Sequence, residues 1–268
     1  MASDPAYEEQ LRSANEIVYK HSLELARLTK SLEIANAQQE SLIHFISHEV
    51  KGALSKGHSA FGEILEGTYG PVSPELVLFS QSSLVEMKKG IAMVMDILDA
   101  ANLKKGTLSF THAPFNMAET VQRSFDELRA IAEKKGLGMS CAITPGEYLF
   151  SGDEGKFEKH VFRNLIDNAI KYTRTGEIVV SLSVNDKMIT FSVKDSGVGI
   201  TPEDRARLFT EGGKGKDSTT VNVQSTGYGL YIAKQVVEAH GGSIRVESAG
   251  AGQGSEFLVE LPRTSASA

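Results

Sequence analysis

Apolar side chains recur through the first part of the chain in alternating steps of four and three residues. The repeating positions are Tyr7, Leu11, Ala14, Val18, His21, Leu25, Leu28, Leu32, Ala35, Gln39, Leu42 and Ile46. This is the a/d spacing of a heptad, which places one apolar stripe along a helix and favours a coiled coil. We therefore expect a long helix that forms a homodimer, and a long helix lying on its own domain is the alternative.

A second helix is expected after a turn. Helical character continues to Glu66, and the following segment, 67–71, has the Gly-Thr-Tyr-Gly-Pro composition of a turn. Ser73 and Pro74 then supply a cap and a proline at the first helical position. The helix is expected to end near Gly106, a residue suited to a C-cap. Two copies of this antiparallel hairpin would make a dimeric four-helix bundle.

Beyond residue 106 the helical periodicity gives way to short β runs mixed with helices. Helices are expected at 117–135, 154–172, 202–209 and 229–240, and strands at 108–110, 138–142, 148–151, 177–184, 188–194, 243–248 and 255–261. The strands cluster towards the end of the chain, so an α/β sandwich with helices on one face of a mixed sheet is expected.

The predicted fold class is therefore multidomain, α followed by α+β. Residues 1–40 are expected to form a signalling coiled coil and residues 41–106 a helical hairpin. Residues 107–263 are expected to form the α/β unit, and residues 264–268 a frayed tail.

Composition excludes several classes of protein. The chain is 41% hydrophobic and 23% charged, and none of its apolar stretches approaches the roughly 20 residues that a membrane helix needs. Its start lacks the basic and apolar regions of a signal peptide, and a single cysteine, Cys141, cannot form an internal disulfide. A net charge of -6 disfavours a nucleic-acid partner. We expect a soluble, cytoplasmic chain.

A histidine followed by a carboxylate lies on the helix that is expected to dimerise. The apolar stripe ends at Ile46, so His48 falls just off the seam, where its imidazole can face solvent. If His48 were a nucleophile, Glu49 could accept its proton or orient the ring. A solvated helix face is the simpler interpretation of this pair alone, and His44 and His58 are nearby competitors.

The helix expected at 154–172 has one polar face. By three- and four-residue spacings this face carries Asn164, Asn168, Lys171 and Tyr172. Amide oxygens suit a hydrated Mg²⁺, a cation suits phosphates, and an aromatic edge suits a base. By spacing alone, an ordinary amphipathic helix is an equally good interpretation.

Two glycine turns follow this helix. An alternating strand runs into Asp-Ser-Gly-Val-Gly at 195–199, where a buried Asp195 could accept a hydrogen bond from an exocyclic amine. The glycines there would let the backbone approach a planar base. A Gly-Tyr-Gly turn at 227–229 opens a helix whose free amides suit phosphates. The polar segment between them, 210–226, is typical of a mobile lid over a ligand.

Taken in order, these four features resemble the sensor histidine kinases, whose ATP-binding half has the Bergerat fold. The resemblance covers about residues 40–262. Gyrase-type topoisomerases, MutL proteins and heat-shock chaperones share the ATP-binding fold but lack the phosphoacceptor hairpin. The resemblance implies a two-component protein-histidine kinase that uses ATP and Mg²⁺ to phosphorylate itself. It then transfers the phosphate to an aspartate of a response-regulator receiver domain.

The resemblance also implies a role for each matching residue. His48 would be the phosphoacceptor, Glu49 its activating neighbour, and Asn168 the residue that holds Mg²⁺ against the phosphates. Asp195 would accept the adenine amino group, and the glycine turn and strand at 252–257 would be structural. The residues implied around the nucleotide are Asn164, Asn168, Lys171, Tyr172, Asp195, Gly197, Gly199, Phe209, Thr226, Gly227, Gly229 and Leu230.

Two positions depart from the family pattern. Family members usually carry Thr or Asn followed by Pro where this chain has Gly52 and Ala53. The missing proline removes a helix kink, and the missing hydroxyl or amide removes the group thought to orient water for dephosphorylating the partner. We therefore expect weak or absent phosphatase activity.

Two other functions remain as alternatives. One is an ATP-binding pseudokinase or scaffold dimer, which the Gly52-Ala53 departure keeps open. The other is an anti-sigma-type serine kinase, which shares the ATP-binding fold. Because the coiled-coil pattern begins almost at the first residue, an upstream sensor domain is expected to be absent from this chain.

Overall fold

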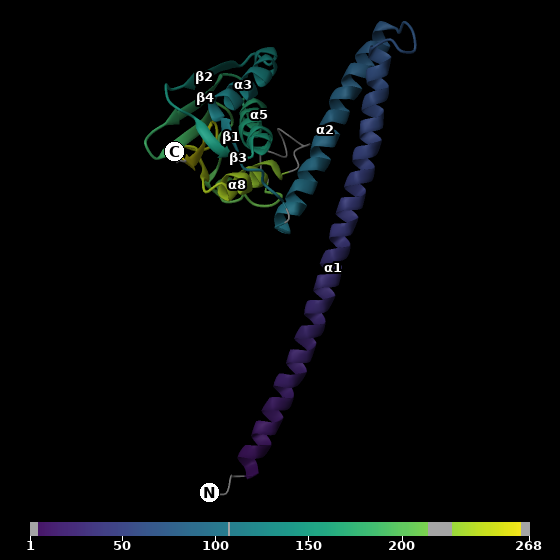
Figure 1. The fold of residues 1–268 in the computed structure, drawn as a ribbon, viewed down its shortest axis with the longest axis vertical. Coiled ribbons are helices and arrows are strands. Elements are labelled where there is room, and N and C mark those ends of the chain that lie inside the picture. The colour runs from purple at the N-terminus through teal and green to yellow at the C-terminus, as the bar shows by residue number, and fades with distance from the viewer. Residues whose placement is uncertain (1–4, 107, 214–226, 264–268) are drawn as a thin grey trace. The chain divides into compact units, whose positions relative to one another are not determined.

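A computed structural model describes residues 5–106, 108–213 and 227–263 of the chain (Figure 1). The chain divides into two compact units, Met1–Ile91 and Ala92–Ala268. Within the described residues, no helix is both long enough and apolar enough to cross a membrane.

The first unit is a helical hairpin. Helix α1 runs without interruption over Pro5–Leu65, and α2 spans Pro74–Lys104, of which the part up to Ile91 belongs to this unit. The connecting turn uses Gly67 and Gly70 in the left-handed region, at φ 78° and 93°. The predicted helices are confirmed, whereas the coiled coil and the dimer stay predictions.

The second unit is built on a five-stranded sheet in the order β2-β4-β5-β7-β6. The pair β2 and β4 is parallel, and the other neighbours are antiparallel. A separate two-stranded sheet pairs β1 with β3. The strands are β1 Ala113–Asn116, β2 Gly138–Ile143, β3 Leu149–Gly152, β4 Glu177–Val184, β5 Met188–Asp195, β6 Ser243–Glu247 and β7 Ser255–Pro262.

Helices cover one face of this sheet, with α3, α5 and α8 side by side on it (Figure 1). The core forms because alternate strand residues, such as Ile178, Val180 and Leu182 of β4, are fully buried against the apolar faces of these helices. The helices are α3 Met117–Lys134, α4 Glu154–Lys156, the π-helical η1 Phe157–Phe162, α5 Arg163–Tyr172, α6 Pro202–Arg205 and α8 Gly229–Ala239. The predicted α-then-α/β architecture is confirmed.

Three local predictions differ from the structure. The prediction of a strand at 108–110 is wrong, because this segment pairs with no strand of the described residues. Phe110 instead packs its ring edge-on against His240, with ring centroids 5.3 Å apart. The strand β1 was not predicted, since its four residues are ordered by pairing with the distant β3. The helix predicted at 202–209 ends at Arg205 and continues as turns.

Candidate functional site

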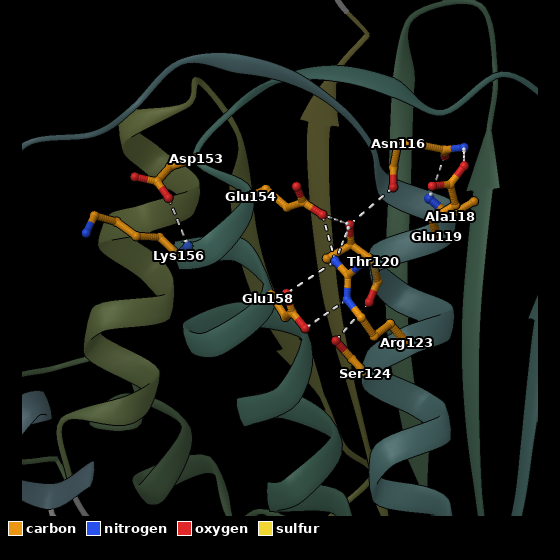
Figure 2. Close-up of polar contacts among 10 residues, drawn as sticks. All are labelled: Asn116, Ala118, Glu119, Thr120, Arg123, Ser124, Asp153, Glu154, Lys156 and Glu158. Carbon is orange, nitrogen blue, oxygen red and sulfur yellow. Dashed lines mark hydrogen bonds and ion pairs between the residues drawn. The ribbon is translucent and has the colours of Figure 1, made fainter. Parts of the chain in front are cut away.

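Helix α3 holds the start of the helical segment 154–172 (Figure 2). Arg123 donates to Glu154 at 2.6 Å and to Glu158 at 3.1 Å, and the Thr120 hydroxyl donates to Glu154 at 2.9 Å. The hydrogen bond from Arg123 is the main reason that the pKa of Glu154 is lowered. Asp153 caps the segment by accepting a backbone N–H through its side chain. These contacts fix the entry to the helix that carries the predicted asparagines.

The amides of Asn164 and Asn168 meet on the polar side of α5. Asn168 Nδ2 donates to Asn164 Oδ1 at 3.4 Å, while the neighbouring Leu165 and Ile166 are fully buried. Asn164 Nδ2 is buried and has no hydrogen-bond partner among the described residues. A buried donor without a partner costs free energy, so this amide is suited to a ligand. Lys171, predicted to contact phosphate, forms an ion pair with Asp167 on the same helix.

The start of α8 lies directly against Asn164. A Cβ on Gly229 would lie 2.7 Å from Asn164 Oδ1, so a larger residue there would displace the Asn164 side chain. Helix α8 starts after Tyr228 without a side-chain cap hydrogen bond, and Gly227 has φ 75°. The start of a helix can offer backbone amides to an anion, and this one lies beside the asparagines.

Part of the predicted phosphate loop is not described. Thr226 and most of the predicted lid, residues 214–226, lie outside the described residues. Phe209, which the resemblance implies lies near the nucleotide, packs edge-on against Phe257 of β7, with ring centroids 6.3 Å apart. Leu230 is half-buried in the first turn of α8.

Asp195 ends β5 and is a buried residue, 7% exposed. Its Oδ1 accepts the Gly197 amide at 2.8 Å, and its Oδ2 accepts the Ser255 hydroxyl at 2.5 Å. Burial raises the pKa of Asp195, and the two hydrogen bonds act in the opposite direction. The carboxylate is thus held in one orientation with little solvent around it.

Ser255 was missed as a candidate site residue. The sequence predicted that the segment 252–257 is structural, but the Ser255 hydroxyl is bonded directly to Asp195. This contact follows from the register of β5 and β7, in which Asp195 is paired with Ser255. A pairing between residues 60 positions apart leaves no local signal in the sequence.

The two glycines after Asp195 are required by the protein's own backbone. A Cβ on Gly197 would overlap the Tyr172 carbonyl oxygen, and a Cβ on Gly199, at φ 68°, would overlap the Gly250 carbonyl. Val198 N donates to the Tyr172 carbonyl at 3.2 Å. The turn that holds Asp195 is thereby joined to the end of α5, and a role of these glycines in shaping a base pocket stays a prediction.

His48 lies on α1 in the first unit, whereas the predicted nucleotide residues lie in the second. Its side chain is 81% exposed, and its Nδ1 is 3.7 Å from Glu49 Oε1. The imidazole is therefore accessible, with a carboxylate beside one ring nitrogen.

Comparison with known proteins adds sequence relatives. Residues 152–265 match the family model described as histidine kinase-, DNA gyrase B-, and HSP90-like ATPase. The sensor protein GacS of Pseudomonas syringae pv. syringae is 29% identical over 245 residues, which are 89% of this chain and 26% of GacS. The sensor protein SrrB of Staphylococcus aureus (strain NCTC 8325 / PS 47) is 29% identical over 227 residues, 84% of this chain and 38% of SrrB. The chain thus spans well under half the length of these relatives.

Solved structures add fold relatives. The crystal structure of full-length ShkA in complex with AMPPNP matches with a TM-score of 0.64 and 25% identity, over 83% of this chain and 45% of ShkA. The Acinetobacter baumannii histidine kinase AdeS matches with a TM-score of 0.54 and 19% identity, over 81% of this chain and 98% of that structure. At that identity, AdeS shows a shared fold.

Proposed function

The chain is a histidine kinase catalytic core, and from this premise we propose that it is the ATP-dependent kinase of a two-component system, with His48 as its phosphoacceptor. The observation that carries the proposal is the oriented, nearly buried Asp195 at one end of an asparagine-bearing helix. This arrangement lies inside the segment that matches the ATPase family model.

We assign the nucleotide by the chemistry of each part of the site. Asp195 Oδ atoms accept the adenine amino group, and the amides at the start of α8 bind phosphate oxygens. Asn164 Nδ2, a donor without a partner among the described residues, fits a phosphate oxygen, and the oxygen of Asn168 fits a phosphate-bound, hydrated Mg²⁺. Among the described residues, no three His, Cys, Asp or Glu side chains gather into a metal site, so the phosphates would supply much of the coordination. Mg²⁺ would supply charge neutralisation during transfer.

His48 Nε2 is the nucleophile in this proposal. Its lone pair forms a bond to the γ-phosphorus as the bond to the β,γ-bridging oxygen breaks, and ADP leaves with that electron pair. Glu49 lies on the Nδ1 side, where it stabilises the positive charge that forms on the ring and takes up its proton. Because His48 and the nucleotide residues belong to different units, transfer requires a state in which a His48 imidazole reaches the γ-phosphate of a bound ATP.

A second copy of the chain and a receiver domain are the proposed protein partners. Val18, Leu25, Leu28 and Leu32 of the predicted heptad stripe are each more than 60% exposed on α1. A row of exposed large apolar side chains on one helix is stabilised by a matching row on a second copy. The phosphate on His48 would then pass to a receiver aspartate.

We also propose that phosphatase activity is weak. Gly52 lies inside α1, and no described atom outside its own helix turn is within 4 Å of where its Cβ would be. The position therefore offers neither a hydroxyl nor an amide to orient water, although there is room for one. Rapid dephosphorylation of a cognate phospho-receiver without ADP-dependent reversal would contradict this expectation.

The central test is phosphorylation with γ-labelled ATP and Mg²⁺. We expect wild-type protein to acquire a label that is lost in acid, and His48→Ala to acquire none. His58→Ala, which removes another histidine of α1, is the matched control and should label normally. A label that survives in His48→Ala but is lost in acid would contradict the role of His48 and indicate another histidine. A label that resists acid as phosphoserine does would favour the serine kinase. Binding of AMPPNP without any label would favour the scaffold.

A further inference from the structure

Helix α3 and the segment 154–172 run in the same direction and are joined by polar contacts along their length. Arg123 bonds Glu154 and Glu158 at the start, as Figure 2 shows, and Glu127 pairs with Arg163 further along. At the far end, the Lys135 ammonium donates to two backbone carbonyls, Ile170 O at 2.5 Å and Lys171 O at 3.2 Å. The first two contacts are between side chains, whereas Lys135 binds the backbone of α5 itself.

The backbone of Lys135 is fixed by the way α3 ends. Gly136 has φ 80° and donates to Glu133 O at 2.9 Å, and Leu137 N donates to Ala132 O at 3.0 Å. This pair of hydrogen bonds is the Schellman motif, and the buried Leu137 anchors it in the core. This motif fixes the backbone of Lys135 at a point from which its ammonium reaches the end of α5.

Lys135 donates hydrogen bonds to two carbonyls at the end of α5 that the helix itself leaves without a donor. A helix leaves its last four carbonyls without the usual partner inside the helix. At the end of α5, Thr173 N donates to Ala169 O at 3.0 Å and Val198 N donates to Tyr172 O at 3.2 Å. The two carbonyls between them are those bonded by Lys135. A cation at this position also complements the negative end of the helix dipole.

The capped end of α5 supports the turn that holds Asp195. Tyr172 O accepts a hydrogen bond from Val198 N, and it lies so close to Gly197 that a Cβ there would overlap it. The turn is therefore packed directly on this carbonyl and keeps its shape only while the carbonyl keeps its position. Gly197 N in turn orients Asp195 Oδ1. We propose that Lys135 is a positioning residue for the adenine end of the nucleotide site, acting through the end of α5. This inference rests on the proposed role of Asp195.

The expected effect of losing the cap is a weaker site in a folded protein. Without the ammonium, the last turn of α5 frays more often, and the nucleotide must restore its order on binding. Charge-assisted hydrogen bonds to carbonyls at a helix end contribute enough to change an equilibrium about tenfold. We therefore expect Lys135→Met to raise the Kd for AMPPNP and the KM for ATP about tenfold, with kcat within about twofold of wild type.

The experiment uses the full chain and three comparisons. Lys135→Arg keeps a cation that can donate to both carbonyls and should restore the affinity to within about threefold. Lys134→Met removes the same charge one residue earlier and should leave the affinity unchanged. Arg129→Met removes another cation of α3, one that pairs with Glu133 of the same helix, and should also leave it unchanged. Hydrogen exchange should be about tenfold faster at the Val198 amide in Lys135→Met alone.

Two results would overturn the inference. One is a Lys135→Met protein that binds AMPPNP as tightly as wild type while its Tm falls, which would make the contact structural only. The other is an equal loss of affinity in Lys134→Met, which would indicate a general effect of charge. The proposed site is tested separately, because Asp195→Asn protein that binds AMPPNP normally would contradict the role of Asp195 itself.

Discussion

The two units of the chain bury their apolar residues in opposite ways. Among residues 1–91, the described side chains that are buried are the polar Ser47 and Ser80, and large apolar residues such as Leu28 and Phe45 are exposed. In the second unit, a continuous apolar core extends from Phe115 to Leu261. A helix pair that leaves its apolar stripe in water lacks part of its stabilising burial, whereas the sheet unit supplies its own.

This difference indicates that the two units are stabilised by different kinds of contact. The hairpin needs a second surface to cover its stripe, so its stability should depend on protein concentration. The sheet unit obtains order from its own core, and its turns from close backbone approaches that glycines permit, so its stability should depend on single positions. Substitutions that act in one unit and spare the other can test this contrast.

The largest expected effect is a loss of stability in the sheet unit. Gly199→Ala places a methyl group at φ 68° against the Gly250 carbonyl, which combines backbone strain with a steric overlap. We expect a destabilisation of about 3 kcal/mol, measured as a lower Tm of the sheet unit in scanning calorimetry. Gly155→Ala is the control, because its nearest contact would be 3.7 Å away. Equal tolerance of both substitutions would contradict the proposed close packing.

Asp195→Asn should separate binding from stability. Replacing the carboxylate removes a charged acceptor for the adenine amine, so we expect AMPPNP affinity to fall roughly a hundredfold by titration calorimetry. The pKa of Asp195 is raised in the folded state, so the stability that this group contributes is present at low pH and is lost as pH rises through the folded-state pKa. A neutral Asn imitates the protonated form, so the Tm at pH 7 should be equal or higher.

Asp186→Asn, an exposed change in the turn before β5, is the control for this substitution. It should alter neither affinity nor Tm. A Tm that falls together with the affinity in Asp195→Asn would instead identify Asp195 as a structural carboxylate.

A smaller effect is expected on assembly of the hairpin unit. Leu28→Asp places a charge on the predicted seam, and its side chain is 61% exposed in the single chain. We expect about a tenfold rise in the dimer Kd by sedimentation equilibrium, because the charge is desolvated when the seam closes. Ala37→Asp adds the same charge at an exposed position off the stripe and should not change the Kd. If the wild-type chain is a monomer, the coiled-coil interpretation is wrong.

Local pattern predicted much of the molecule. Heptad spacing predicted the helical first unit, and the alternation of residues predicted the strands that now bury Ile178 and Val180. The contacts that complete the site were not predictable in this way. Ser255 reaches Asp195 across paired strands, and Lys135 reaches α5 from 35 residues earlier. Such contacts depend on register and helix packing, which single-residue patterns do not encode.

The smallest expected effect concerns Gly52, which differs from Gly199 although both are glycines. Gly52 lies within α1, and a Cβ there would meet no described atom within 4 Å. Gly52→Ala should therefore stabilise the hairpin by about 0.5–1 kcal/mol, because alanine loses less conformational entropy in a helix. Urea unfolding followed by far-UV circular dichroism at a fixed protein concentration would measure it. If Gly52→Ala instead lowers the stability, and lowers it more at protein concentrations where the dimer forms, then a second copy packs its side chains against Gly52.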